Sequence, residues 1–172
     1  MLNAKESHKK LDWYARHYDY NVDYMREMLE IAPEAYATFE AFLPMANFVK
    51  STPLEVMNVA KITAMKYQDC SDCFQLILDM AVEVGVDKEI IKSLVFHDGE
   101  GLSDELKDVR KFTLAVLENR GIDEELQSKM TEKYSRDVMM ELGLAIASMQ
   151  VFPIIRRTVN AFKSCNIMEL KI

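Results

Sequence analysis

The sequence is poor in residues that interrupt helices. Its 172 residues include only 5 glycines and 4 prolines, whereas the good helix formers leucine, methionine, alanine, glutamate and lysine are common. No segment alternates apolar and polar residues as a half-buried strand does. A chain of this length can bury the core of one domain, and its 49% hydrophobic and 28% charged content is typical of folded soluble proteins. We therefore expect one all-α domain.

Positive charge and long apolar runs are also scarce, which argues against several classes of function. The formal net charge is -7, and no Lys/Arg cluster is interleaved with aromatic residues as in a nucleic-acid groove. No apolar run looks long enough to span a bilayer. The segment Met1 to Glu6 is polar and lacks the core of a signal peptide. The expectation is a cytoplasmic protein that binds neither membrane nor nucleic acid.

The chain has only three cysteines, and in a reducing compartment these do not imply a structural disulfide. Cys70 and Cys73 form a CxxC motif, whereas Cys165 lies far from it and is interpreted as a bystander. A second CxxC and an HxxxH motif are both missing, and the three histidines are scattered. A zinc site is therefore not expected, and the sequence predicts no metal and no cofactor.

Caps and breakers mark the expected helices. Ser7 is suited to cap a first helix whose apolar face runs from Leu11 to Leu29. Pro33 then opens a second helix, and the capping box at 52–55 opens a third that ends near Tyr67. Further helices are expected after Asp87, Ser103, Asp123 and Ser135, with Gly85 and Gly121 beyond helix ends and Pro153 kinking or ending the last long helix.

The CxxC motif directly precedes an apolar helical segment, 74–82. Asp69 is suited to be the N-cap, which would place both sulfurs in the first turn, where free N–H groups and the helix dipole favour a thiolate. Asp69 and Asp72 oppose this effect, because they disfavour a further negative charge. The motif therefore predicts either a moderately activated dithiol at Cys70 and Cys73 or two small buried core residues.

The order of these elements resembles the alkylhydroperoxidase AhpD-like, or carboxymuconolactone decarboxylase, family over about residues 33–162. The resemblance implies an AhpD-like all-helical bundle at 33–165, an N-terminal helical extension at 1–32 and a C-terminal tail at 166–172. It also implies a homo-oligomer, either a dimer, a trimer or a hexamer. The similar features are the CxxC at a helix start, the turn from Gly85 to Ile90, the helix start at 102–104, and Leu142 to Ala147 leading into Arg156 and Arg157.

The resemblance further implies chemistry at the CxxC. In the peroxidase branch one cysteine attacks peroxide, the other resolves the sulfenic acid to a disulfide, and a dithiol partner protein reduces it. The family pattern makes Cys73 the attacking thiol and Cys70 the resolving one, although helix position alone favours Cys70 as the more acidic. The family's relay glutamate and histidine are both missing, because Asn58 and Ile77 stand at those positions.

Three other side chains are candidates for the missing relay. Glu55 lies one turn before Asn58 and is a candidate for a base that acts through water. Lys61 lies one turn after Asn58 and is a candidate for a thiolate stabiliser. Asp72 stands where some family members carry a histidine. The competing interpretation for Glu55 and Lys61 is a solvated helix surface.

The leading hypothesis is an antioxidant thiol oxidoreductase with peroxiredoxin or disulfide-exchange activity, acting weakly on a small peroxide or disulfide. Because the relay is missing, whether the chain is an enzyme at all stays open. One alternative is a non-catalytic oligomeric helical module of the same family. A second alternative is a lyase or isomerase that uses the interhelical cavity without the thiols.

Overall fold

The computed structural model describes residues 3–119, 121–161 and 170–172, and within these residues the regular elements are all helices. This confirms the predicted all-α fold class. In chain order the nine helices of the described residues are α1 (Ala4–Tyr18), α2 (Asp23–Ile31), α3 (Pro33–Ala46), α4 (Leu54–Tyr67), α5 (Ser71–Glu83), α6 (Lys88–Phe96), α7 (Asp104–Glu118), α8 (Glu124–Lys133) and α9 (Arg136–Thr158).

The N-terminal segment forms two helices instead of the single helix predicted. The cap of α1 is Asn3 and not Ser7, because the Asn3 side chain accepts a hydrogen bond from the backbone N–H of Glu6. The helix ends at Tyr18 and is followed by Asp19, whose backbone is left-handed with a φ of 51°. The apolar pattern from Leu11 to Leu29 continues across this break because α1 and α2 face the same cluster.

Most of the other predicted boundaries are confirmed. Pro33 is the first residue of α3, and Gly85 follows the end of α5 with a φ of 88°, a conformation that glycine adopts without strain. Pro153 lies inside α9 and does not end it. The side chains of Asp87, Ser103 and Asp123 each accept a backbone N–H bond in the first turn of α6, α7 and α8.

Besides Ser7, two further predicted caps are wrong. Thr52 does not cap α4, because its hydroxyl donates instead to the Glu141 carboxylate at 2.8 Å, and the N-cap position belongs to Pro53. Asp69 does not cap α5 either. The N-cap of α5 is Cys70, and Asp69 precedes it with a left-handed φ of 53°.

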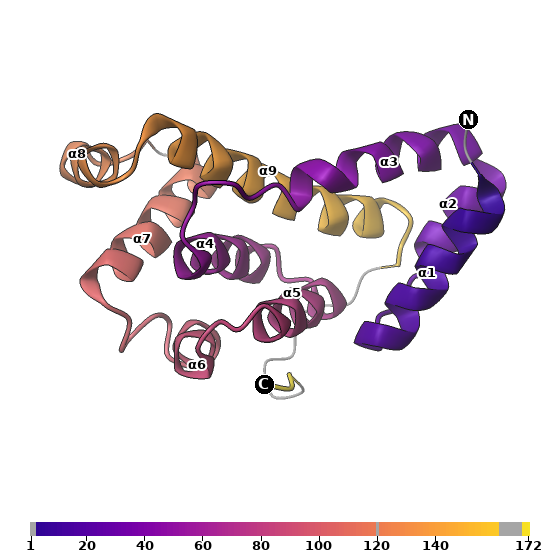
Figure 1. The fold of residues 1–172 in the computed structure, drawn as a ribbon, viewed down its shortest axis with the longest axis horizontal. Helices are drawn as coiled ribbons and strands as arrows, with labels where there is room; N and C mark the ends of the chain where they lie inside the picture. Colours follow the sequence, from indigo (N-terminus) through magenta and orange to yellow (C-terminus); the bar gives the residue numbers. More distant parts are fainter. Residues whose placement is uncertain (1–2, 120, 162–169) are drawn as a thin grey trace.

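Helix α4 lies at the centre of the main core. It packs against α5, α6, α7 and α9, which surround it in Figure 1. Four of its residues have no exposed surface at all: Val59, Ala60, Ile62 and Ala64. Because α4 directly precedes the CxxC motif, this core fixes one wall of the region around the cysteines.

A second apolar cluster joins α1, α2 and α3. Phe152 of α9 packs against both this cluster and the main core, so the two are continuous. Figure 1 shows α1 and α2 side by side opposite α5, with α3 and α9 connecting them to the rest of the bundle. The segment predicted as an extension therefore packs onto α3 and α9.

The loop before α4 is held by Glu141 of α9. Its carboxylate accepts hydrogen bonds from the backbone N–H groups of Lys50, Ser51 and Thr52 at 2.9–3.1 Å, and from the Thr52 hydroxyl. Burial raises the pKa of Glu141, but these hydrogen bonds outweigh burial and lower the pKa to about 2. A single buried carboxylate thus connects the loop to the long helix.

Among the helices of the described residues, only α9 is long and apolar enough to cross a membrane by length and composition. The sequence pattern predicts no segment that meets this criterion. A core helix also meets it, and α9 packs against α3 and α4. The criterion therefore does not distinguish a membrane span from a core helix here.

Candidate functional site

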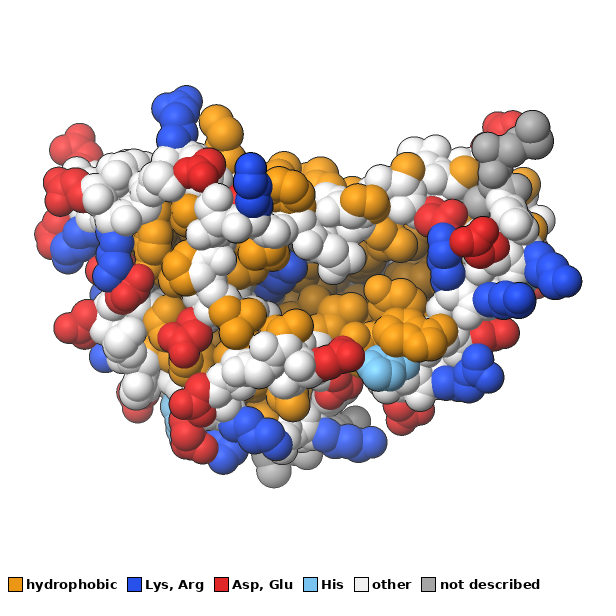
Figure 2. Space-filling view, in the orientation of Figure 1, with side chains coloured by type: hydrophobic (Ala, Val, Ile, Leu, Met, Phe, Trp, Pro, Cys, Tyr) orange, Lys and Arg blue, Asp and Glu red, His pale blue; other side chains and the backbone are white. Residues whose placement is uncertain are grey.

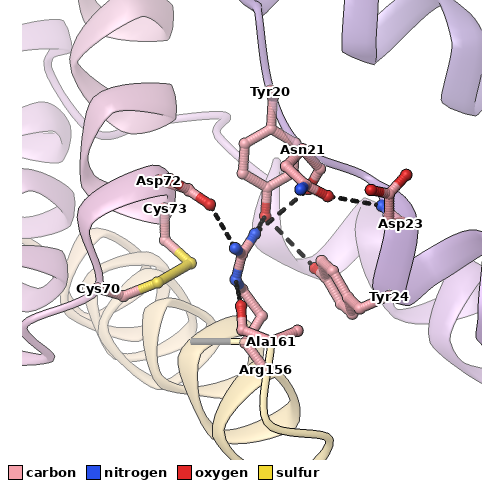
Figure 3. A network of polar contacts seen from close by, with 9 residues as sticks. All are labelled: Tyr20, Asn21, Asp23, Tyr24, Cys70, Asp72, Cys73, Arg156 and Ala161. Carbon is pink, nitrogen blue, oxygen red and sulfur yellow. Dashed lines mark hydrogen bonds and ion pairs between the residues drawn. A yellow bond between two sulfur atoms is a disulfide. The ribbon is translucent and has the colours of Figure 1, made fainter. Parts of the chain in front are cut away.

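The two cysteines of the CxxC motif lie at the start of α5 and form a disulfide (Figure 3). Cys70 is the N-cap, and its carbonyl accepts the backbone N–H of Phe74 at 2.8 Å. The Cα atoms of the two cysteines are 5.3 Å apart, inside the usual range of about 4.4–6.8 Å for a disulfide. The pair can therefore close without backbone movement.

A cavity of about 780 Å³ meets the protein surface beside α4 and α5, and Cys73 lines it. Figure 2 shows this face hollowed, with hydrophobic side chains on the walls. Residues three and four apart lie on one helix face, which explains which positions reach the cavity. These are Leu54, Met57, Asn58, Lys61 and Met65 from α4, and Cys73, Leu76, Ile77, Met80 and Glu83 from α5.

The opposite wall comes from the N-terminal helices. Trp13 and Tyr14 of α1 and Phe39 and Leu43 of α3 line the cavity, together with Phe152 of α9. These named residues make this wall of the cavity aromatic and aliphatic. Sequence reasoning did not place α1 at the site, because helix periodicity identifies an apolar face but not what that face encloses.

The two cysteines differ in their access to this cavity. Cys73 is 2% exposed and lines the cavity, whereas Cys70 has no exposed surface and does not line it. A molecule that enters the cavity therefore meets Cys73 first. Access thus favours Cys73 as the first thiol to react, even though Cys70 occupies the N-cap.

Both positions at which the family resemblance expects a proton relay lie on the cavity wall with Cys73. The Asn58 side chain donates to the carbonyl of Leu54 at 2.8 Å, and Ile77 is a buried aliphatic residue. Neither side chain carries a proton that titrates near neutral pH. Neither residue therefore supplies the titratable relay that the resemblance implies.

Lys61 and Glu55 lie in different surroundings, although both were candidates for the relay. Lys61 lines the cavity together with Cys73, and burial lowers the pKa of its ammonium group. The described residues give Lys61 neither a hydrogen bond nor an ion pair. Glu55 is exposed in the first turn of α4 and does not line the cavity. A role for Lys61 beside a Cys73 thiolate stays a prediction.

Asp72, the third relay candidate, points from between the two cysteines toward Arg156 of α9 (Figure 3). Arg156 is 2% exposed and donates to the Asp72 carboxylate, which makes a charge-assisted pair. Its other acceptors are the Tyr20 hydroxyl at 3.3 Å, the Asn21 carbonyl at 3.3 Å and the Ala161 carbonyl at 3.0 Å.

This pairing changes the electrostatic expectation for the cysteines. We expected Asp72 to disfavour a thiolate, but the Arg156 guanidinium compensates its charge. The guanidinium carbon also lies 5.6 and 5.2 Å from the ring centroids of Tyr20 and Tyr24. Sequence reasoning missed this role of Arg156, and the available signal was a charged residue at the end of the long apolar stretch of α9.

The remaining predictions concern metals and Cys165. In the part of the chain that the structure describes, no group of three or more His, Cys, Asp or Glu side chains is placed to hold a metal ion. Cys165 lies outside the described residues.

Comparisons of this chain with protein-family models, with curated proteins and with solved structures found no match.

Proposed function

We propose that this chain is a thiol oxidoreductase of the AhpD-like type, in which Cys73 attacks a small peroxide and Cys70 resolves the product. The observation that carries the proposal is the unequal placement of the two sulfurs. Cys73 lines an apolar cavity, while its disulfide partner Cys70 is fully buried behind it. A peroxide in the cavity would therefore reach Cys73 before Cys70, which suits Cys73 as the nucleophile and Cys70 as the resolving thiol.

The cycle balances with these two thiols and one external reductant. The Cys73 thiolate attacks one peroxide oxygen, the O–O bond breaks, and the other oxygen leaves and takes up a proton. The Cys70 sulfur then displaces hydroxide from the Cys73 sulfenic acid, which forms the disulfide and releases water. A dithiol donor reduces the disulfide by exchange and returns both thiols.

Protonation of the leaving oxygen is the step that the site supports least. Asn58 and Ile77 stand where a titratable pair would lie, so the proposed donor is water that enters the cavity. General acid–base catalysis contributes roughly 10²–10⁴-fold to such steps. We therefore propose slow turnover, with an organic hydroperoxide favoured over hydrogen peroxide because the cavity walls are apolar.

Stopped-flow oxidation of the reduced protein tests this proposal. We expect cumene hydroperoxide to form the Cys70–Cys73 disulfide faster than it oxidises a free cysteine thiol, and faster than hydrogen peroxide does. Cys73→Ser abolishes the fast phase. If the disulfide forms no faster than a free thiol reacts, and the thiol pKa stays near the unperturbed value of about 8.5, the chain is a non-catalytic helical module instead.

A further inference from the structure

The cavity contains one partly buried cation that no described residue compensates. Lys61 lies on the α4 wall, is partly buried, and has no ion pair or hydrogen bond within the described residues. A lysine in such surroundings loses hydration and gains no counter-ion, which is unfavourable unless something else supplies the negative charge. The lowered pKa of Lys61 agrees with that desolvation.

The acidic side chains that line the cavity already have partners. Glu40 accepts from Lys10 at 3.1 Å, and Lys10 also lies 3.8 Å from Glu6. Glu83 accepts from His17 at 3.1 Å and from Tyr18. These acids come from α1, α3 and the end of α5, and none of them pairs with Lys61.

We infer that the cavity binds an amphipathic monoanion, an apolar chain that ends in a carboxylate, with the carboxylate on the Lys61 ammonium and the chain along α4 and α5. A volume of about 780 Å³ falls in the usual range of roughly 300–1,000 Å³ for small-molecule sites. The walls along α4 and α5 are mostly apolar, so they suit a hydrocarbon chain. The single positive charge of the Lys61 ammonium group matches the single negative charge of a monoanion. A carboxylate also accepts strong hydrogen bonds from an ammonium group.

The inference rests on the proposed function in one respect: the same cavity would bring this ligand to Cys73. Binding itself needs no turnover. In the disulfide form, no thiolate exists that would pair with Lys61. The measurement is therefore made on the oxidised, full-length protein, so that its result is independent of any peroxidase activity.

Isothermal titration calorimetry with decanoate, below its micelle concentration, tests the inference. Decanol is the uncharged ligand of the same length. Lys61→Met removes the charge but keeps an apolar side chain, and Lys9→Met is the matched control, because Lys9 lines the cavity from the exposed surface of α1. Trp13, the only tryptophan, also lines the cavity and reports binding by its fluorescence.

We expect Lys61→Met to weaken decanoate binding by about tenfold or more, while decanol binding stays within about twofold. We expect Lys9→Met to leave the binding of decanoate and of decanol unchanged. Because Lys61→Met removes a desolvated charge, it remains folded and melts no lower than the wild type. Its melting curve separates a binding defect from misfolding.

Two outcomes overturn the inference. One is that decanoate does not bind the wild-type protein, and the other is that Lys61→Met binds decanoate as tightly as the wild type does. If binding is absent and the protein is a dimer that decanoate does not perturb, the first outcome assigns the cavity to a second copy of the chain. Intact decanoate binding without any peroxide reaction would reject the proposed function and leave this inference standing.

Discussion

The buried guanidinium of Arg156 in α9 donates to the carboxylate of Asp72, which stands inside the CxxC motif 84 residues earlier in the sequence. The Arg156 side chain is 3% exposed and that of Asp72 is 28% exposed. The pair therefore sits at the boundary of the core, beside the two sulfurs in Figure 3. Removing either member leaves an uncompensated charge next to the thiols.

We expect the two members of this pair to shift the thiol pKa in opposite directions. Asp72→Asn leaves the Arg156 cation uncompensated and lowers the pKa of Cys73 in the reduced protein, whereas Arg156→Met leaves the Asp72 anion and raises it. The double variant returns the pKa toward the wild-type value. The measurement is the rate of iodoacetamide alkylation as a function of pH.

A matched control for these variants is Asp69→Asn. Asp69 also flanks the motif, but it is exposed, and asparagine tolerates its left-handed backbone. We expect Asp69→Asn to shift the pKa of Cys73 less than Asp72→Asn does, because solvent screens the charge of Asp69. Arg156→Met also destabilises the fold, by on the order of 3 kcal/mol for a broken, mostly buried pair. Shifts of the same sign in Asp72→Asn and Arg156→Met would contradict the electrostatic account.

Restoring the missing proton relay is expected to accelerate the proposed chemistry. Asn58→Glu with Ile77→His places a titratable pair on the wall that Cys73 lines. We expect disulfide formation with cumene hydroperoxide to rise by at least about tenfold, below the roughly 10²–10⁴-fold that evolved acid–base groups supply. Stopped-flow oxidation of the reduced variant measures the change.

The control for the relay variant is Asn58→Gln with Ile77→Asn, which adds polarity but no titratable proton near neutral pH. This control tests whether a more polar cavity wall alone accelerates disulfide formation. An equal rate in the two double variants would show that proton transfer is not the limiting feature. A folded Glu/His variant with no gain in rate would contradict the placement of the proposed reaction on this wall.

Glu141 makes stability depend on pH in the acid range. Its pKa is about 2 in the folded protein, below the ordinary value of 4.5, so folding favours the ionised form. The stabilisation is full above about pH 4.5 and is lost as the pH falls toward about 2. Glu141→Gln should therefore lower the melting temperature at pH 7, and the difference from the wild type should shrink as the pH approaches 2.

Glu125→Gln is the control for this titration, because Glu125 is exposed and pairs with Lys129 one helix turn away. Its effect on melting is expected to be small at every pH. Thermal unfolding followed by circular dichroism from pH 2 to pH 7 makes the comparison. If the melting temperatures of the wild type and the Glu141→Gln variant differ by the same amount at every pH in that range, the lowered pKa of Glu141 is contradicted.

Local signals predicted much of the fold. Pro33, Gly85, Asp87 and Ser103 act where the sequence placed them, because a breaker or a cap depends on its immediate neighbours. The prediction failed where a distant residue competed with the local one. Thr52 has the form of a cap, but its hydroxyl donates to Glu141, 89 residues away.

The candidate site was predictable only in part. The CxxC motif identified the thiols, and helix spacing placed Asn58 and Lys61 near one face of α4. Spacing alone did not separate Lys61 from Glu55, because both lie one turn from Asn58. The contact between Arg156 and Asp72 joins segments far apart in the chain, and no local pattern encodes it.

The account depends most on Cys73 being the thiol that peroxide reaches first. Mass spectrometry after dimedone trapping tests this directly, with reduced Cys70→Ser and Cys73→Ser variants treated with cumene hydroperoxide. The account predicts a dimedone adduct on Cys73 in the Cys70→Ser variant, where no resolving thiol remains, and little or none on Cys70 in the Cys73→Ser variant. Trapping on Cys70 alone, or equal trapping on both, would contradict it.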